Sequence, residues 1–121
     1  MKTIIVVDDD LDISRLISFR LKKVGYNALI ANNGKTALTL LKDTQADLIL
    51  LDLRMPVMDG FEFSKVAKKD ENLKDIPIII LTASNTTQES NQIQEINARG
   101  FFKKPFDFEE VLETIKDVIG N

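Results

Sequence analysis

The 121-residue chain contains no cysteine and no histidine. Without cysteine it has no disulfides, no thiolate nucleophile and no Cys-ligated zinc or iron–sulfur centre. Without histidine it has no Ser-His-Asp or Cys-His catalysis, no imidazole metal ligand and no phosphohistidine of its own. The side chains left for chemistry are carboxylates, lysines, arginines and hydroxyls.

Long apolar runs and an excess of positive charge are also missing. The first apolar run, Ile4–Val7, stops at three aspartates, and no run approaches the ~18 residues that a membrane span needs. With 16 basic and 19 acidic side chains, the net charge of −3 argues against general binding to nucleic acid or anionic membranes. We therefore expect a cytoplasmic protein with no membrane contact and no direct nucleic-acid contact.

Short apolar runs alternate with helical patterns along the whole chain. Unbroken aliphatic runs are typical of parallel strands that are covered by helices on both faces. The expected strands are Ile4–Val7, Ala28–Ala31, Leu48–Leu51, Ile78–Leu81 and Phe101–Phe102. This alternation predicts an α/β fold with a doubly wound, five-stranded parallel sheet.

The helical patterns differ in strength. The first has an apolar stripe of Ile13, Leu16, Ile17, Leu21 and Val24, with Gly25 as its C-cap. Shorter helices are expected after Asn33-Gly34 (Ala37, Leu38, Leu41) and after Asp59-Gly60 (Phe61, Val66, Ala67). The fourth, residues 84–99, offers mainly Ile93, Ile96 and Ala98, which describes either a solvated surface helix or an element free to shift. In the last, Asp107 is the expected N-cap of a stripe of Phe108, Val111, Leu112, Ile115 and Ile119, with Glu110 completing a capping box.

Polar side chains follow the expected strands at one edge of the sheet, where open α/β sheets bind ligands. Asp8 and Asp9 follow the first strand, Asp52 the third, Thr82 the fourth and Lys104 the fifth. Carboxylates about 5 Å apart repel by roughly 3 kcal/mol per pair and require protons or a cation. Oxygen ligands of this kind select Mg²⁺, with Mn²⁺ or Ca²⁺ as alternatives, and a phosphate commonly completes the shell.

Each of these residues also has a plainer interpretation. Asp10, next to this group, is better explained as the N-cap of the first helix. A lone Thr82 would be explained by a turn after the strand, and a lone Lys104 by a solvated surface charge. The sequence has neither the dinucleotide-binding nor the P-loop glycine motif, and three aspartates after the first strand would repel a flavin phosphate.

These motifs together resemble the receiver domain of two-component response regulators, of the stand-alone chemotaxis type, over Ile4 to Ile119. The segments that carry the resemblance are Val6-Val7-Asp8-Asp9, Leu50-Leu51-Asp52-Leu53-Arg54-Met55-Pro56, Met58-Asp59-Gly60, Leu81-Thr82-Ala83 and Lys103-Lys104-Pro105-Phe106. The resemblance implies strand order 2-1-3-4-5, a flavodoxin-like (βα)5 topology, a single receiver domain over residues 1–121, and a cis Lys104–Pro105 peptide.

The resemblance also implies the site roles. Asp52 is the expected phosphoacceptor, with Thr82 and Lys104 contacting the phosphoryl oxygens. Asp9, Asp52 and the backbone carbonyl of Arg54 would bind Mg²⁺, with Asp8 acting through water, and Mn²⁺ could substitute. Phe101 occupies the aromatic switch position of the family. The alternative is that Phe101 is only a core or half-buried strand residue.

Some positions depart from the family pattern or modulate it. The resemblance implies that Arg54 and Ser84, two residues beyond Asp52 and Thr82, occupy positions that border the phosphoryl group and influence the lifetime of the acyl phosphate. Asn97 and Arg99 replace the small or acidic residues common before the last strand, although Asn97 can still take a left-handed C-cap conformation.

The expected partners are a sensor histidine kinase or histidine phosphotransfer protein, and a downstream protein that recognises the fourth helix, fifth strand and fifth helix. The kinase would contact the first helix around Ser14, Ser18 and Lys22. Because Asn121 follows the last helix directly, we expect a single-domain regulator. We expect it to be a monomer, and dimerisation on phosphorylation is left open. The alternative that the chain is an excised receiver domain of a larger regulator also stays open. We expect no enzyme activity beyond self-catalysed phosphorylation and dephosphorylation. Two alternatives are an Asp-nucleophile Mg²⁺ phosphohydrolase, disfavoured by Arg54 where a general acid is needed, and a pseudo-receiver without Mg²⁺ affinity.

Overall fold

The computed structural model describes residues 1–83 and 90–121, and within them five strands and five helices alternate along the chain. The strands are β1 (Thr3–Val7), β2 (Asn27–Ala31), β3 (Leu48–Leu51), β4 (Ile78–Thr82) and β5 (Gly100–Lys103). The helices are α1 (Leu11–Lys23), α2 (Gly34–Asp43), α3 (Gly60–Lys68), α4 (Ser90–Ile96) and α5 (Phe108–Ile119). All pairings are parallel and the strand order is β2-β1-β3-β4-β5, which confirms the predicted fold class and topology.

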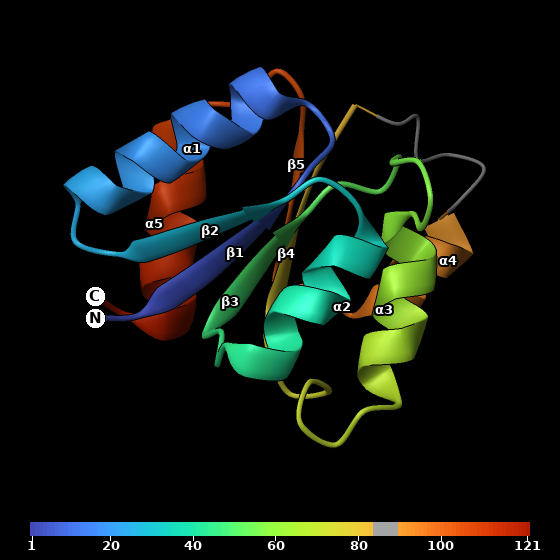
Figure 1. The fold of residues 1–121 in the computed structure, drawn as a ribbon. Helices are drawn as coiled ribbons and strands as arrows, with labels where there is room; N and C mark the ends of the chain where they lie inside the picture. The colour runs from blue at the N-terminus through green and yellow to red at the C-terminus, as the bar shows by residue number, and fades with distance from the viewer. Residues whose placement is uncertain (84–89) are drawn as a thin grey trace.

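Figure 1 shows the sheet between two helical layers, with α1 and α5 on one face and α2, α3 and α4 on the other. Alternate residues of the central strands therefore enter two separate cores. Ile4 and Val6 of β1 pack in the α1/α5 core, whereas Ile5 and Val7 pack in the core beneath α2, α3 and α4. Both faces are apolar because both are covered, as the unbroken aliphatic runs predicted.

The strand predictions were correct in place and short at some ends. The β3 bounds match the prediction, whereas β1, β2 and β5 each begin one residue earlier than expected, and β5 also extends to Lys103. The β4 strand includes Thr82, whose carbonyl accepts a hydrogen bond from the Lys104 amide (2.9 Å). The terminal residues are polar or small, so hydrophobic runs could not mark them.

The stripe predicted for α1 was partly wrong. Ile17 and Leu21 are buried as expected, but Leu16 and Val24 are 59% and 45% exposed. The face that packs on the sheet instead runs through Ser14 and Ser18, which are buried. Ser14 can be buried because its hydroxyl donates to the backbone carbonyl oxygens of Asp8 (3.2 Å) and Asp10 (2.9 Å). The expected kinase-contacting surface around Ser14 and Ser18 is therefore wrong for both serines.

The helix ends follow their capping residues. The Asp10 carboxylate accepts from the amides of Asp12 and Ile13, and the Asp107 carboxylate accepts from Glu109, so both N-cap predictions are confirmed. The C-cap of α1 lies one residue before the predicted one: it is Val24, and Gly25 follows with a left-handed φ of +100°, which favours glycine.

Two further helix predictions concern α3 and α4. Val66 of α3 is 43% exposed rather than buried, because α3 contacts the core mainly through Phe61, Phe63 and Ala67. In α4, Ile96 is buried and Ile93 partly buried, and Asn97 has the expected left-handed conformation at φ 55°. The start of the predicted helix and Ser84 lie outside the described residues.

Candidate metal and phosphoacceptor site

The ends of β1 and β3 bring two buried aspartates side by side. Val7 is in register with Leu51, so the next residues, Asp8 and Asp52, leave the sheet together. The Asp52 amide donates to the Val7 carbonyl (2.9 Å), and the Asp8 amide donates to the Ala31 carbonyl (3.0 Å). The backbone of both residues is thus fixed by the sheet, and only 2% of Asp8 and 6% of Asp52 is exposed.

Asp9 completes a cluster of three carboxylates. One ligand oxygen from each of Asp8, Asp9 and Asp52 lies within 4.8 Å of the others, and Asp9 is exposed to solvent. At that separation two negative charges repel by roughly 3 kcal/mol at an effective dielectric constant of 20. The cluster therefore needs positive charge nearby.

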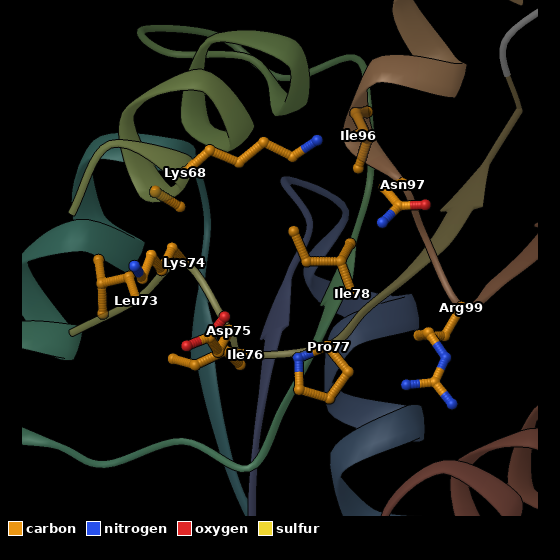
Figure 2. A pocket seen from close by; sticks show the side chains of 11 residues that line it. Lys68, Leu73, Lys74, Asp75, Ile76, Pro77, Ile78, Ile96, Asn97 and Arg99 are labelled. Carbon is orange, nitrogen blue, oxygen red and sulfur yellow. The ribbon is translucent and has the colours of Figure 1, made fainter. Parts of the chain in front are cut away.

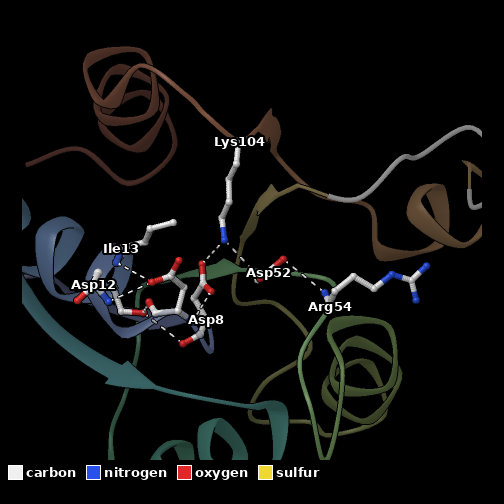
Figure 3. A network of polar contacts seen from close by, with 8 residues as sticks. Asp8, Asp12, Ile13, Asp52, Arg54 and Lys104 are labelled. Atoms are coloured by element: carbon white, nitrogen blue, oxygen red, sulfur yellow. Dashed lines mark hydrogen bonds and ion pairs between the residues drawn. The ribbon is translucent and has the colours of Figure 1, made fainter.

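Lys104 supplies one such charge from the loop after β5 (Figure 3). Its Nζ lies 2.6 Å from Asp8 Oδ2 and 3.4 Å from Asp52 Oδ2, and only 13% of its side chain is exposed. The expected cis peptide between Lys104 and Pro105 is present. The lysine that was predicted to contact a phosphoryl group thus contacts the carboxylates that would surround it.

The pKa values of Asp8 and Lys104 reflect burial together with pairing. Burial raises the pKa of the Asp8 carboxyl, and the charge of Asp52 adds to this, although hydrogen bonds from Lys104 and from the Asp10 amide oppose it. Burial alone would lower the pKa of Lys104, but its hydrogen bonds and charge interactions with Asp8 and Asp52 outweigh that effect and raise it. The raised pKa keeps Lys104 protonated at neutral pH. The three carboxylates outnumber this one ammonium, so they can attract a further cation.

Thr82 and Arg54 border the same edge of the sheet. Thr82 is fully buried at the end of β4, in register with Lys103 of β5. The Arg54 amide lies 3.4 Å from Asp52 Oδ1, whereas its side chain extends away from the carboxylates, with Cζ 5.7 Å from the centre of the Phe61 ring (Figure 3). Arg54 can therefore contribute its backbone without placing its guanidinium among the carboxylates.

Phe101 is not part of this cluster. Phe101 pairs with Ile80, which lies two residues before Thr82 in β4. The Phe101 residue is 39% exposed. It lines a cavity of about 370 Å³ between α4 and β5, together with Ile93 and Ala98. Phe101 is therefore a partly exposed strand residue rather than a core residue, and its role as a switch stays a prediction.

Sequence reasoning treated Gly60 only as part of a turn. A Cβ at Gly60 would lie 2.4 Å from the Asp52 carbonyl oxygen and 2.9 Å from Leu53 Cα. The Gly60 amide also donates to the Leu53 carbonyl (3.1 Å). The start of α3 thus lies directly against the backbone of Asp52, and the Asp59-Gly60 pair was the only signal in the sequence for this contact.

The donor set fits a hard divalent cation. Three carboxylates with no nitrogen or sulfur ligand nearby suit Mg²⁺, Mn²⁺ or Ca²⁺, and a short protein ligand set that leaves room for water is typical of Mg²⁺. The adjacent lysine would place a second positive charge next to any anion bound there. Such a site can stabilise the charge of a phosphoryl group during transfer.

Comparison with known proteins agrees with this geometry. A family model described as "Response regulator receiver domain" matches residues 4–116. The chain is 40% identical over 120 residues to the phosphate regulon transcriptional regulatory protein PhoB of Pseudomonas aeruginosa, covering 98% of this chain and 52% of that protein. It is 37% identical to the DNA-binding dual master transcriptional regulator RpaA of Synechocystis, covering 98% of this chain and 49% of that protein. The chain thus spans about half the length of these curated relatives.

Solved structures are similar over the full chain. The chemotaxis response regulator CheY4 of Vibrio cholerae superposes with a TM-score of 0.88 at 33% identity, covering 98% of both chains. The non-phosphorylated HemR receiver domain of Leptospira biflexa gives a TM-score of 0.87 at 32% identity, covering 100% of this chain and 96% of that one.

Among the described residues, no helix is both long enough and apolar enough to cross a membrane.

Proposed function

This chain belongs to the response regulator receiver domain family of two-component signalling, and on that premise we propose that Asp52 is its phosphoacceptor. Receiver domains take phosphoryl groups from histidine kinases and act on downstream targets. The observation that carries the proposal is the position of Asp52, which is buried directly after β3 beside a second carboxylate, Asp8, and shares the Lys104 ammonium with it.

The proposed reaction is transfer of a phosphoryl group from a phosphohistidine to a carboxylate oxygen of Asp52. The carboxylate attacks phosphorus, the phosphorus–nitrogen bond breaks, and the imidazole of the donor leaves with the electron pair. The product is an acyl phosphate on Asp52. The step needs positioning and charge stabilisation rather than a general base, which is consistent with a chain that has no histidine.

A divalent cation fits the same residues. Asp9, Asp52 and the Arg54 carbonyl would hold Mg²⁺, with Asp8 acting through water, and Mn²⁺ could substitute. When bound, the cation supplies the positive charge that lets an anionic carboxylate and an anionic phosphoryl group approach.

Thr82 and Lys104 would bind the phosphoryl oxygens. Both stand at the edge of the sheet that carries the aspartates, and Lys104 already lies 3.4 Å from Asp52. Phosphorylation would give Lys104 a new anionic partner and Thr82 a new acceptor. We infer that this rearrangement changes the α4, β5 and α5 surface, where Phe101 is exposed beside a cavity and can change rotamer.

The phosphoryl donor would dock beside Lys104. An apolar cavity of about 280 Å³ lies between α1 and the loop after β5, lined by residues that include Ile13, Leu16, Lys104 and Phe106. Leu16 and Phe19 are each 59% exposed on the outer side of α1. An apolar surface next to the acceptor site suits a helix of a sensor kinase or phosphotransfer protein.

The test is modification by a small acyl phosphate in the presence and absence of Mg²⁺, followed by intact-mass measurement. We expect one added phosphoryl group on the wild-type chain with Mg²⁺, and none on Asp52→Asn. Asp10→Asn is the matched control, because it removes an adjacent carboxylate while asparagine still caps α1. Modification that persists in Asp52→Asn would overturn the proposal, and turnover of a phosphomonoester would favour a phosphohydrolase instead.

A further inference from the structure

The turn between β2 and α2 joins the two loops that carry the aspartates. The Ala31 carbonyl, at the end of β2, accepts a hydrogen bond from the Asp8 amide (3.0 Å). Three residues later, the Gly34 amide donates to the Met58 carbonyl in the β3–α3 loop (2.9 Å). The start of α2 is thus attached to the loop that follows Asp52.

The contact between Gly34 and Met58 is close. Gly34 is buried and has no positive φ, so its own conformation does not require glycine. A Cβ at Gly34 would lie 2.8 Å from Met58 Cγ, 2.9 Å from the Met58 carbonyl oxygen and 3.0 Å from Met58 Sδ. Because Gly34 has no side chain, α2 can approach the loop closely enough to form the hydrogen bond.

The loop that Gly34 holds has a strained backbone. Val57 has a φ of 70°, and the Met58 amide donates to the Pro56 carbonyl (2.8 Å), which closes a three-residue turn around Val57. A positive φ is unfavourable for a β-branched residue and persists where the surrounding structure holds it. Val57 is 74% exposed, so its side chain adds little packing to hold the turn. The hydrogen bond from Gly34 to the next residue supplies such a restraint.

The same loop begins beside the cation site. The Arg54 amide lies 3.4 Å from Asp52 Oδ1, and the Arg54 carbonyl is the proposed backbone ligand of Mg²⁺. The Gly60 amide donates to the Leu53 carbonyl (3.1 Å), so the loop is attached to α3 as well as to α2, and these two helices lie side by side in Figure 1. Both attachments restrain the loop before any cation binds.

We propose that Gly34 is a positioning residue for the cation site, because it holds the β3–α3 loop, and with it the Arg54 carbonyl, in place for Mg²⁺. This inference rests on the proposed function, in which Arg54 supplies a backbone ligand. Loss of a group that orients a metal ligand typically weakens metal binding by about 10–100-fold. We expect the lower end, about tenfold, since one ligand of several is affected.

The experiment is a titration of the ¹⁵N-labelled chain with MgCl₂, followed by the amide signals of Asp9, Asp52 and Arg54. Gly34→Ala should bind Mg²⁺ about tenfold more weakly than the wild type, because the added methyl group meets Met58 and displaces the loop. Affinity is measured on the folded protein, so a general loss of stability does not change it.

Gly100→Ala is the matched glycine control. Gly100 begins β5 at the opposite edge of the sheet, directly after Arg99, which lines the cavity shown in Figure 2. The three atoms nearest to a Cβ at Gly100 belong to side chains, and the closest is Thr114 Cγ2 at 3.1 Å. The variant adds the same methyl group away from the cation site, so its Mg²⁺ affinity should stay within about twofold of the wild type.

The double variant Gly34→Ala/Met58→Ala separates positioning from general destabilisation. Truncation of Met58 removes Cγ and Sδ, two of the three atoms that the new methyl group would meet. The loop can then return toward its place, so the double variant should bind Mg²⁺ about threefold more tightly than Gly34→Ala. A merely structural role for Gly34 would give no such rescue.

The wild-type chain provides a test that does not depend on how the variants fold. If the attachment of the loop to Gly34 favours Mg²⁺ binding, bound Mg²⁺ must in turn stabilise that attachment. Hydrogen exchange at the Gly34 amide should therefore slow when Mg²⁺ is added. The Gly25 amide, which donates to the Lys22 carbonyl (3.1 Å), should not change.

Equal Mg²⁺ affinity in Gly34→Ala and the wild type would overturn the proposal, as would equal losses in Gly34→Ala and Gly100→Ala. Exchange at the Gly34 amide that Mg²⁺ leaves unchanged would also overturn it. These results would leave the acceptor role of Asp52 standing, because intact mass tests that role separately. A wild-type chain whose signals do not respond to Mg²⁺ would overturn the cation site and this inference together.

Discussion

Replacing Lys104 with methionine would remove the only protein cation in contact with the buried carboxylates among the described residues. Methionine keeps the unbranched shape of the side chain, so the change is mainly one of charge. Asp8 and Asp52, with 3% and 7% of their side chains exposed, would then lack their common partner. The variant isolates what the ammonium contributes to the fold.

The distances set the magnitude. At 2.6 Å from Asp8 and 3.4 Å from Asp52, the ammonium attracts each carboxylate by roughly 5 to 6 kcal/mol at an effective dielectric constant of 20. Desolvation offsets part of this, and removal of one partner from a buried ion pair typically costs about 3–5 kcal/mol. We expect the lower end, about 3 kcal/mol at neutral pH, because Asp8 can take up a proton. For a chain of this length that corresponds to a fall in Tm of about 12 °C.

The pH dependence follows from the direction of the Asp8 shift. Burial already raises the pKa of Asp8 above its ordinary value of 3.8, and loss of Lys104 would raise it further. A carboxyl whose pKa is raised on folding binds more protons in the folded state, so its destabilising effect is greatest above the folded pKa. The deficit of Lys104→Met should therefore shrink as the pH falls toward 3.8.

Thermal unfolding followed by circular dichroism measures these effects, with Lys103→Met as an exposed control. Mg²⁺ should raise the Tm of Lys104→Met more than that of the wild type, because the cation takes over the neutralising role of the ammonium. The double variant Asp8→Asn/Lys104→Met should recover part of the lost stability. If Lys104→Met and Lys103→Met lose the same stability, and Mg²⁺ acts equally on both, the electrostatic reasoning is refuted.

Three further predictions concern the backbone and the core. Val57 is 74% exposed and has a left-handed φ of 70°, which strains a β-branched residue. Val57→Gly should therefore raise the free energy of unfolding, measured by urea denaturation, by about 0.5–1 kcal/mol, and a lower free energy of unfolding would contradict this strain. Gly60→Ala should cost about 2–3 kcal/mol in the same assay, because its Cβ would meet the Asp52 carbonyl at 2.4 Å; a neutral effect would show that α3 can shift. Tyr26→Phe should cost about 1 kcal/mol by losing the hydroxyl's hydrogen bond to the Gly120 carbonyl (2.7 Å). Burial raises the pKa of Tyr26 above 10.0, so this contribution is present below pH 10 and is lost as the pH rises through the raised value; a deficit in Tyr26→Phe that persists at higher pH would count against it.

The sheet was predictable because its strands are covered on both faces. Runs such as Leu48–Leu51 have no polar residue to blur their bounds, and the residue after each run could be assigned to the same edge of the sheet. That rule was enough to predict that Asp8, Asp9 and Asp52 would meet. It could not reveal how Lys104 would be oriented, because a lysine side chain has several rotatable bonds.

The helix faces were harder to predict because apolar spacing does not show which edge of a stripe reaches the core. Leu16 shares the period of Ile17 and Leu21 but lies at the edge of the stripe, where the sheet does not cover it. Ser14 and Ser18 lie on the covered side, and hydroxyls that bond to backbone carbonyls can be buried there, as Ser14 shows. Hydrophobicity alone gave no signal for buried serines.

The central claim, that Asp52 forms an acyl phosphate, is tested most directly by locating the modified residue. Borohydride reduces an aspartyl phosphate to homoserine, which peptide mass spectrometry identifies by position after treatment with an acyl phosphate and Mg²⁺. We predict homoserine at position 52 and unmodified aspartate at positions 8 and 9. Homoserine at position 8 or 9, or aspartate at all three positions, would contradict the claim.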